Sequence, residues 1–300
     1  MSYRQDRPPA SPAIRLKTSA MRLTAAWLTM TCLGCGDSKS PVQATPVLPA
    51  PAPGPVSVDG QVNDTARRPI DGVRVEVVDG PSAGVFATTN TAGHYDLPGV
   101  FSEPFTVGAT KEGYAPFTTT PSMRYAPVSI YIVLALSTPS VNLAGDYTLT
   151  LTADTACSGL PDAARSRSYT VSMTSRPNTP ENYRAVLGGA TFLSSEAGQF
   201  DVDVAGTYAH FRFGDPWDDG DGAKREGSYI IEEVAPSTYL GIAGSAGLTV
   251  NGGTTMSGSF SGGVQYCVNP NPAAIGNYQC PVGQPVVCNS TNQRMLLVRR

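Results

Sequence analysis

Apolar and polar residues alternate with a period of two along most of the chain after residue 55. VRVEVV (73–78) places Val73, Val75 and Val77 on one face of an extended segment, and VSIYIVLAL (128–136) repeats the pattern with β-branched and aromatic residues. Such alternation is typical of half-buried β-strands. Similar short runs recur about every 8–12 residues, with Gly, Pro, Asn and Asp between them. This spacing predicts a β-sandwich over residues 56–137.

Residues 140–300 show the same period. Tyr147, Leu149 and Leu151 alternate with threonine in DYTLTLT (146–152), and comparable runs continue to RMLLVRR (294–300). We expect about eight or nine strands here and no helix. Such a meander closes into an antiparallel β-barrel or folds into a two-sheet sandwich. The expected fold class is therefore all-β throughout.

Four cysteines lie in this second half, at Cys157, Cys267, Cys280 and Cys288. An even number predicts two disulfides if the chain folds in an oxidising compartment, with three possible pairings. Cys157 follows the first strand and Cys288 precedes the last, so a Cys157–Cys288 bond would fasten those strands together and place Tyr147 opposite Val298. Cys267 and Cys280 would then close a Pro/Asn-rich loop. The rival pairings stay open at this point.

The N-terminal segment combines a basic start with a short apolar run. Arg15, Lys17 and Arg22 precede LTAAWLTMTCLG (23–34), which at about 12 residues is short for a membrane span of about 20. A C-x-x-C redox pair would need a βαβ context, which this region lacks. The run predicts a signal peptide over residues 1–35, with Met21 as an alternative start to Met1.

The end of this run, CLGCGD (32–37), resembles the lipobox of bacterial lipoproteins. The resemblance implies cleavage before Cys35 and lipidation of that cysteine, hence a membrane partner held through acyl chains. Gly36 directly after Cys35, with Asp37 one position later, favours the outer membrane. The sequence departs from the lipobox pattern at Cys32 and Leu33, and a plain cleaved signal is the alternative. Residues 36–55 are rich in Pro and Ala and predict an extended linker.

Four segments occur in a recognisable order between residues 60 and 114: GQV (60–62), PIDGVRVEV (69–77), TTNTAGHY (88–95) and FTVGATKEGY (105–114). They resemble the carboxypeptidase regulatory-like domain, which implies a seven-stranded, transthyretin-like β-sandwich. In peptidases such a module is an accessory beside a zinc domain. Zinc ligands are His, Cys and carboxylates at set spacing. The two histidines, His94 and His210, begin no such pattern, so zinc catalysis is not expected.

The net charge of the chain limits the classes of partner that it is expected to bind. The chain has a formal net charge of −3. Its first 34 residues carry five basic groups and one acidic group, so removing this +4 leader leaves a mature chain at −7. A basic surface is the usual mark of nucleic-acid binding. Nucleic acid is therefore not an expected partner.

The loop GDPWDDGDGAKREG (214–227) gathers carboxylates beside glycines. Oxygen ligands on a tight loop are what calcium prefers, so a calcium site is a candidate there, although the spacing does not fit an EF-hand and a solvated loop is the alternative. Trp217 in the same loop could stack on a sugar ring, or fold back as a plug. The candidate calcium ligands are Asp215, Asp218, Asp219 and Asp221.

These features together predict a non-catalytic lipoprotein of the cell envelope that acts as a binding or scaffolding module, with carbohydrate as the most concrete ligand. One alternative is an envelope hydrolase that uses carboxylates of the second half. Another is a structural subunit of an envelope complex. The hydrolase candidates are Asp201, Asp203, Glu232 and Glu233.

Overall fold

The computed structural model describes residues 56–101, 104–123, 127–193, 197–213, 230–250, 254–268 and 286–300. All of these belong to the larger of the two units into which the chain divides, Pro51–Arg300. Their buried hydrophobic side chains gather in two main clusters, one within residues 56–134 and one within residues 143–297.

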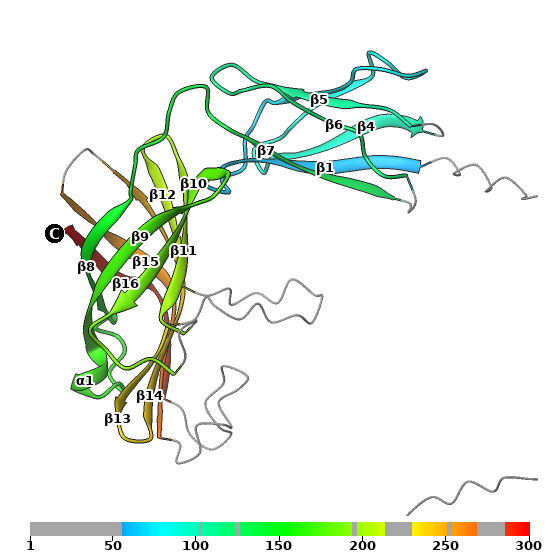
Figure 1. Ribbon diagram of the computed structural model, residues 1–300. Helices are drawn as coiled ribbons and strands as arrows, with labels where there is room; N and C mark the ends of the chain where they lie inside the picture. The colour runs from blue at the N-terminus through cyan, green and yellow to red at the C-terminus, as the bar shows by residue number, and fades with distance from the viewer. Residues whose placement is uncertain are drawn as a thin grey trace, which may run out of the picture. The chain divides into compact units, whose positions relative to one another are not determined.

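The first half folds as a seven-stranded β-sandwich, as the sequence predicts. One sheet has three strands in the order β4-β1-β7, and the other has four in the order β3-β2-β5-β6 (Figure 1). β1 pairs antiparallel with β4 and parallel with β7. The strands are β1 (Val56–Asp64), β2 (Arg74–Val77), β3 (Phe86–Thr88), β4 (His94–Phe101), β5 (Val107–Thr110), β6 (Phe117–Thr119) and β7 (Val128–Leu134).

The alternating residues of these strands build the sandwich core. Val73, Val75 and Val77 are fully buried, as the period of two predicts. Gly93 occupies the turn before β4 with φ at +76°. A Cβ there would lie 2.5 Å from the backbone oxygen of Val62. Both the left-handed backbone and this close approach require glycine.

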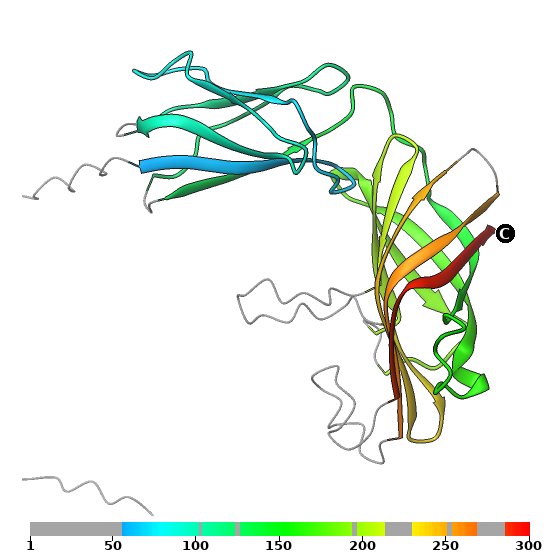
Figure 2. The same cartoon turned by 180° about the vertical axis from the view of Figure 1, so that it is seen from behind.

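The second half is a closed antiparallel barrel, which decides between the two architectures expected from the sequence. Its strands follow in the order β12-β11-β10-β9-β8-β16-β15-β14-β13, and β12 also pairs with β14 to complete the ring. Figure 2 shows the last strand, β16, between β15 and β8. The strands are β8 (Gly145–Thr152), β9 (Ser166–Arg176), β10 (Thr179–Gly188), β11 (Gln199–Ala205), β12 (Tyr208–Arg212), β13 (Ile230–Ala235), β14 (Thr238–Thr249), β15 (Thr255–Val268) and β16 (Val286–Arg299).

Nine strands fill eight positions round this barrel, because β12 and β13 share one edge of β14. β12 pairs with residues 245–249 of β14, and β13 pairs with residues 238–242. On its other edge, β13 bonds to the segment after β10, where Leu193 N donates to Ile231 O and Glu233 N donates to Thr191 O. Both sides of the shared position are therefore hydrogen-bonded.

Inward-facing side chains fill the barrel. Phe200 and Phe213 lie with ring centroids 4.8 Å apart, and Phe260 contacts Phe213 edge-on at 5.6 Å. All three rings are buried. Aromatic pairs at such separations add about 0.5–1.5 kcal/mol beyond their area burial. The interior is thus a packed core.

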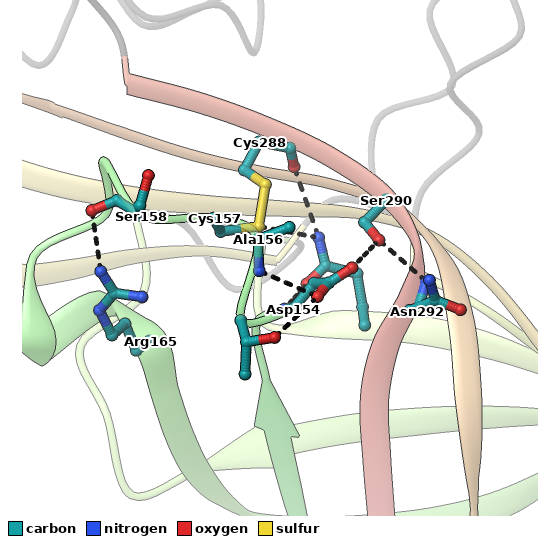
Figure 3. The surroundings of a disulfide bond; sticks show 10 residues. Asp154, Ala156, Cys157, Ser158, Arg165, Cys288, Ser290 and Asn292 are labelled. Carbon is teal, nitrogen blue, oxygen red and sulfur yellow. Dashed lines mark hydrogen bonds between the residues drawn. A yellow bond between two sulfur atoms is a disulfide. The ribbon is translucent and has the colours of Figure 1, made fainter.

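The predicted Cys157–Cys288 disulfide is present and joins Cα atoms 5.6 Å apart (Figure 3). The predicted register is wrong by one residue, because Tyr147 lies opposite Arg299 and Thr148 lies opposite Val298. The reason is that β8 ends at Thr152. Cys157 sits in the loop beyond the ladder, so its position does not fix the pairing.

Side chains around this disulfide tie the loop to β16. Asp154 N donates to Gln293 Oε1 at 2.8 Å, and Ser290 Oγ donates to the Asp154 carboxylate (Figure 3). The hydrogen bonds from Ser290 and from Ala156 N lower the pKa of Asp154. Shortly after this loop comes α1 (Asp162–Arg165), a single helical turn that the sequence analysis did not anticipate.

Removing the disulfide should destabilise the barrel. The bond closes a loop with a sequence separation of 131 residues. Chain entropy then predicts that Cys157→Ala/Cys288→Ala lowers the free energy of unfolding by about 2–5 kcal/mol. Urea unfolding of the oxidised wild type and the variant measures this loss. Equal unfolding midpoints would contradict the prediction.

Candidate functional site

The solvent face of the three-stranded sheet in the sandwich carries polar and aromatic side chains in register. Tyr131 of β7, Gln61 of β1 and His94 of β4 lie directly opposite one another across the sheet. In the neighbouring row, Asp59 lies opposite Asp96. Two inter-strand spacings make the row from Tyr131 to His94 about 10 Å wide, and one spacing of about 5 Å separates Asp59 from Asp96. We call these five residues the Tyr131 face.

Tyr131 is the most exposed large hydrophobic residue in the described part of the chain, with 71% of its surface accessible, and Val133 two residues on is 54% exposed. A single exposed ring is common on protein surfaces, so what makes this one a candidate is the set of polar side chains aligned with it. Beside it, Asp59 and Asp96 place two like charges opposite each other, which costs stability. Such local violations are expected at functional sites.

Arginines surround two carboxylates on the outer surface of the barrel. Asp201 of β11 accepts from Arg176 at 2.5 Å, and Arg184 and Arg212 lie 3.4 Å from its oxygens. Asp203 Oδ2 accepts from Arg212 Nε at 2.9 Å. We call Arg176, Arg184 and Arg212 the arginine row.

Two further side chains bond to Asp203. Asn182 Nδ2 donates to Oδ1 at 2.7 Å, and Arg67 Nε donates to Oδ2 at 2.9 Å. Asp203 itself is only 4% exposed. A buried carboxylate needs such partners, because an unpaired charge away from water is costly.

His210 of β12 lies between these groups and β14, opposite both Asp203 and Gly247. Burial lowers its pKa, because desolvation disfavours the imidazolium. Within the described residues, its buried Nδ1 has no hydrogen-bond partner, and the same holds for Asn63 Oδ1 next to the Tyr131 face. Buried polar atoms without partners are uncommon in folded proteins.

An ion pair also lies at the barrel interior. Glu232 of β13 accepts from Arg167 Nε at 2.8 Å and from the Tyr169 hydroxyl at 2.9 Å. The Glu232 side chain is 2% exposed. The hydrogen bond to Glu232 raises the pKa of Arg167, and burial raises the pKa of Tyr169. Two donors from β9 therefore satisfy one carboxylate from β13.

Comparison with known families bears on the first half of the chain. Residues 57–134 match the sequence model of the carboxypeptidase regulatory-like domain. This stretch is a carboxypeptidase regulatory-like domain. The Tyr131 face lies wholly within it, whereas the arginine row and Glu232 lie outside it.

Solved structures add only distant likenesses. Two type II cohesin–X-dockerin complexes from Acetivibrio cellulolyticus match at 20% and 21% identity, each with a TM-score of 0.24, over 29% of this chain and 61% of theirs. A streptococcal ancillary pilin matches at 10% identity and a TM-score of 0.20, over 52% of both chains. This chain therefore spans less than two thirds of each of these three chains. No curated protein matches.

The four carboxylates considered for a hydrolase are all engaged. Asp201 and Asp203 share one face of β11, as their spacing predicts, and both are bound by arginines. Glu232 is paired with Arg167, and Glu233 Oε1 accepts from Ser237 N at 3.1 Å. Asp201 and Asp203 lie on the outward face of β11, although Asp203 is covered by its partners, and Glu232 is inside the barrel. The structure therefore does not assemble them into one acid–base pair.

Several predicted site residues lie outside the described residues, and their roles stay predictions. They include Cys35, Trp217 and the candidate calcium ligands Asp215, Asp218, Asp219 and Asp221. Cys267 is disulfide-bonded, but Cys280 also lies outside the described residues. Among the residues that are described, no group of three or more His, Cys, Asp or Glu could hold a metal ion. No helix in the described part is long and apolar enough to span a membrane.

Sequence reasoning missed the Tyr131 face and the arginine row. It read Tyr131 only as a member of an alternating strand, and it treated His94 as a surface residue, which the structure confirms. The sequence signal for Tyr131 was its position in the alternating strand. Its neighbours Ile130 and Ile132 are buried, so Tyr131 points to the opposite, exposed face. Arg176, Arg184 and Arg212 come from three strands, so only the strand register reveals that they meet.

The interior ion pair generates a prediction about stability. Arg167→Met leaves Glu232 buried without its cation, which should lower the free energy of unfolding by about 3–5 kcal/mol. Arg167→Met/Glu232→Gln also removes the unpaired buried charge. Its free energy of unfolding should therefore fall less than that of Arg167→Met. Urea unfolding of both variants measures the difference.

The exposed pair Arg74–Glu76 provides the control, since its side chains are 44% and 33% accessible. Arg74→Met should cost less than about 1 kcal/mol. A double variant less stable than Arg167→Met would show that the burial of Glu232 is not what makes the single substitution costly.

Proposed function

We propose that this protein is a non-catalytic binding module of the cell envelope, and that its carboxypeptidase regulatory-like domain holds a polysaccharide chain on the Tyr131 face. The observation that carries this proposal is the accessible ring of Tyr131, aligned with polar side chains on two neighbouring strands. An amphipathic ring offers an apolar surface together with a polar tip. The C–H faces of sugar rings suit that surface.

The neighbours of Tyr131 supply the hydrogen bonds that sugar hydroxyls require. The carboxylates of Asp59 and Asp96 accept hydrogen bonds when ionised, and Gln61 and His94 can both donate and accept. Gln61 Nε2 is already bonded to Ala92 O at 3.1 Å, which fixes the orientation of its amide. A hydroxyl between Asp59 and Asp96 would also relieve their mutual repulsion. An open sheet face of this kind favours a polymer that runs across it.

Substitution of the aromatic ring tests the proposal. Tyr131→Ala should weaken binding to the polysaccharide at least tenfold, because the apolar contact is lost and only hydrogen bonds remain. A panel of neutral and cell-wall polysaccharides immobilised in gels, with the full-length chain purified in mild detergent, measures the change. Tyr131→Phe keeps the ring and should retain most of the affinity.

Phe86 provides a matched control, since it is 48% exposed on the opposite sheet, with Arg74 stacked 3.6 Å from its ring centre. Phe86→Ala should leave binding unchanged. Equal losses in both alanine variants would reveal non-specific adhesion. Absence of binding to every polysaccharide would reject the glycan ligand and direct the search to envelope proteins.

We further propose that Cys35 anchors the protein to the envelope membrane, with the outer membrane as its destination. The apolar run that precedes Cys35 and the Pro-rich stretch that follows it support this proposal. Cys35→Ala should move the protein from the membrane fraction to the soluble fraction, since the acyl chains supply the membrane affinity. Cell fractionation with immunoblotting measures the shift. Cys32→Ala, three residues earlier, should leave the protein at the membrane, and unchanged fractionation of Cys35→Ala would rule out the anchor.

A further inference from the structure

We propose that the arginine row on the outer surface of the barrel is a second binding site, which takes the carboxylate or sulfate groups of an acidic polysaccharide. This site is independent of the Tyr131 face. Its basis is an excess of cations among the described residues: three arginines of the barrel, and Arg67 as a fourth, meet two carboxylates there, Asp201 and Asp203.

Neutralising the two aspartates does not explain this excess. Arg212 alone bridges both carboxylates, through its Nε to Asp203 at 2.9 Å and its NH2 to Asp201 at 3.4 Å. Arg176 and Arg184 then add two more charges around Asp201. Like charges held this close repel one another unless a further anion joins them. The excess stands out because the whole chain is acidic, with a formal net charge of −3.

Arg176 and Arg184 are available to a ligand. Their side chains are each 40% exposed. Arg184 uses its NH1 to bond Gln199 Oε1 at 2.7 Å, and Arg176 uses its NH2 to bond Asp201. A guanidinium has five N–H donors, so each group keeps further donors for solvent or a ligand. The planar fork of arginine fits the paired oxygens of a carboxylate or a sulfate.

The strand register makes the row a preformed site. Arg184, Asp201, Arg212 and Ser245 lie opposite one another on four successive strands, β10, β11, β12 and β14. The buried Asp203 holds the guanidinium of Arg212 in place from below. Residues fixed on strands of a closed barrel lose little freedom on binding, which favours affinity.

An acidic polysaccharide fits this site better than a nucleic acid does. Duplex DNA carries one charge per about 1.7 Å of its axis, so binding it takes a run of many cations. A polyuronate such as polygalacturonate presents its charges farther apart, one on each sugar ring. A local site with an excess of one or two cations suits such isolated charges.

The test measures binding of the full-length chain to polygalacturonate, dextran sulfate, uncharged dextran and duplex DNA at two salt concentrations. Retention by an acidic polysaccharide, but not by dextran, is expected. Arg176→Gln/Arg184→Gln should weaken that binding at least tenfold. Both arginines are solvent-accessible, so the variant should fold, and its thermal unfolding midpoint verifies this.

Two further variants sharpen the test. Arg294→Gln/Arg300→Gln makes the same change in net charge at exposed arginines away from the row and should alter affinity less than twofold. Asp201→Asn removes the carboxylate that competes for the same donors, so it should strengthen binding. Inorganic sulfate as a competitor separates a polymer ligand from a free anion.

Four results would overturn the proposal. They are absence of binding to both acidic polysaccharides, equal losses in the two double arginine variants, binding of DNA as tight as that of the acidic polysaccharide, and binding of inorganic sulfate as tight as that of the polymer. Tyr131→Ala in the same assay keeps the two sites apart, since it should leave binding of the acidic polysaccharide unchanged.

Discussion

The second half of the chain depends on the closure of its sheet. Every strand has two edges of backbone N–H and C=O groups, and an open sheet leaves two of those edges unpaired. Here the first strand, β8, pairs with the last, β16, and β12 and β13 together occupy the remaining edge of β14. Closure packs Leu149 and Leu297 into one core. The consecutive strands β9 to β12 then carry the arginine row on the outside of that closed wall.

The sequence predicted elements well because alternation reports directly which side of a strand is buried. The valines of β2 and the tyrosine and leucines of β8 illustrate this, and segments such as TTNTAGHY identified the sandwich family before the fold was known. Register was harder, since it depends on where each strand ends. Cys157 lies five residues beyond β8, so the argument from the cysteines gave the correct bond and a ladder shifted by one residue. One such shift moves every side chain to a different neighbour.

Functional sites were harder to predict from the sequence than strand register. The carboxylates that looked like candidates for catalysis, Asp201 and Glu232, turn out to belong to different ion pairs on opposite sides of the barrel wall. Their partners, Arg176 and Arg167, are distant in sequence from them, so no local motif links each pair. For Tyr131 the sequence was more informative, because the alternation of buried and exposed residues along its strand predicts that it is exposed. Its significance appears only when the neighbouring strands bring Gln61 and His94 beside it.

The long sequence separation between β8 and β16 also affects when the barrel can form during synthesis. A ribosome adds about 5–20 residues per second, so β16 emerges on the order of ten seconds after β8. Until then, β8 lacks one of the two strands that flank it, whereas the sandwich already has all seven of its strands. Pairings between distant segments also form slowly once the chain is complete. The barrel therefore cannot close until its last strand has been synthesised.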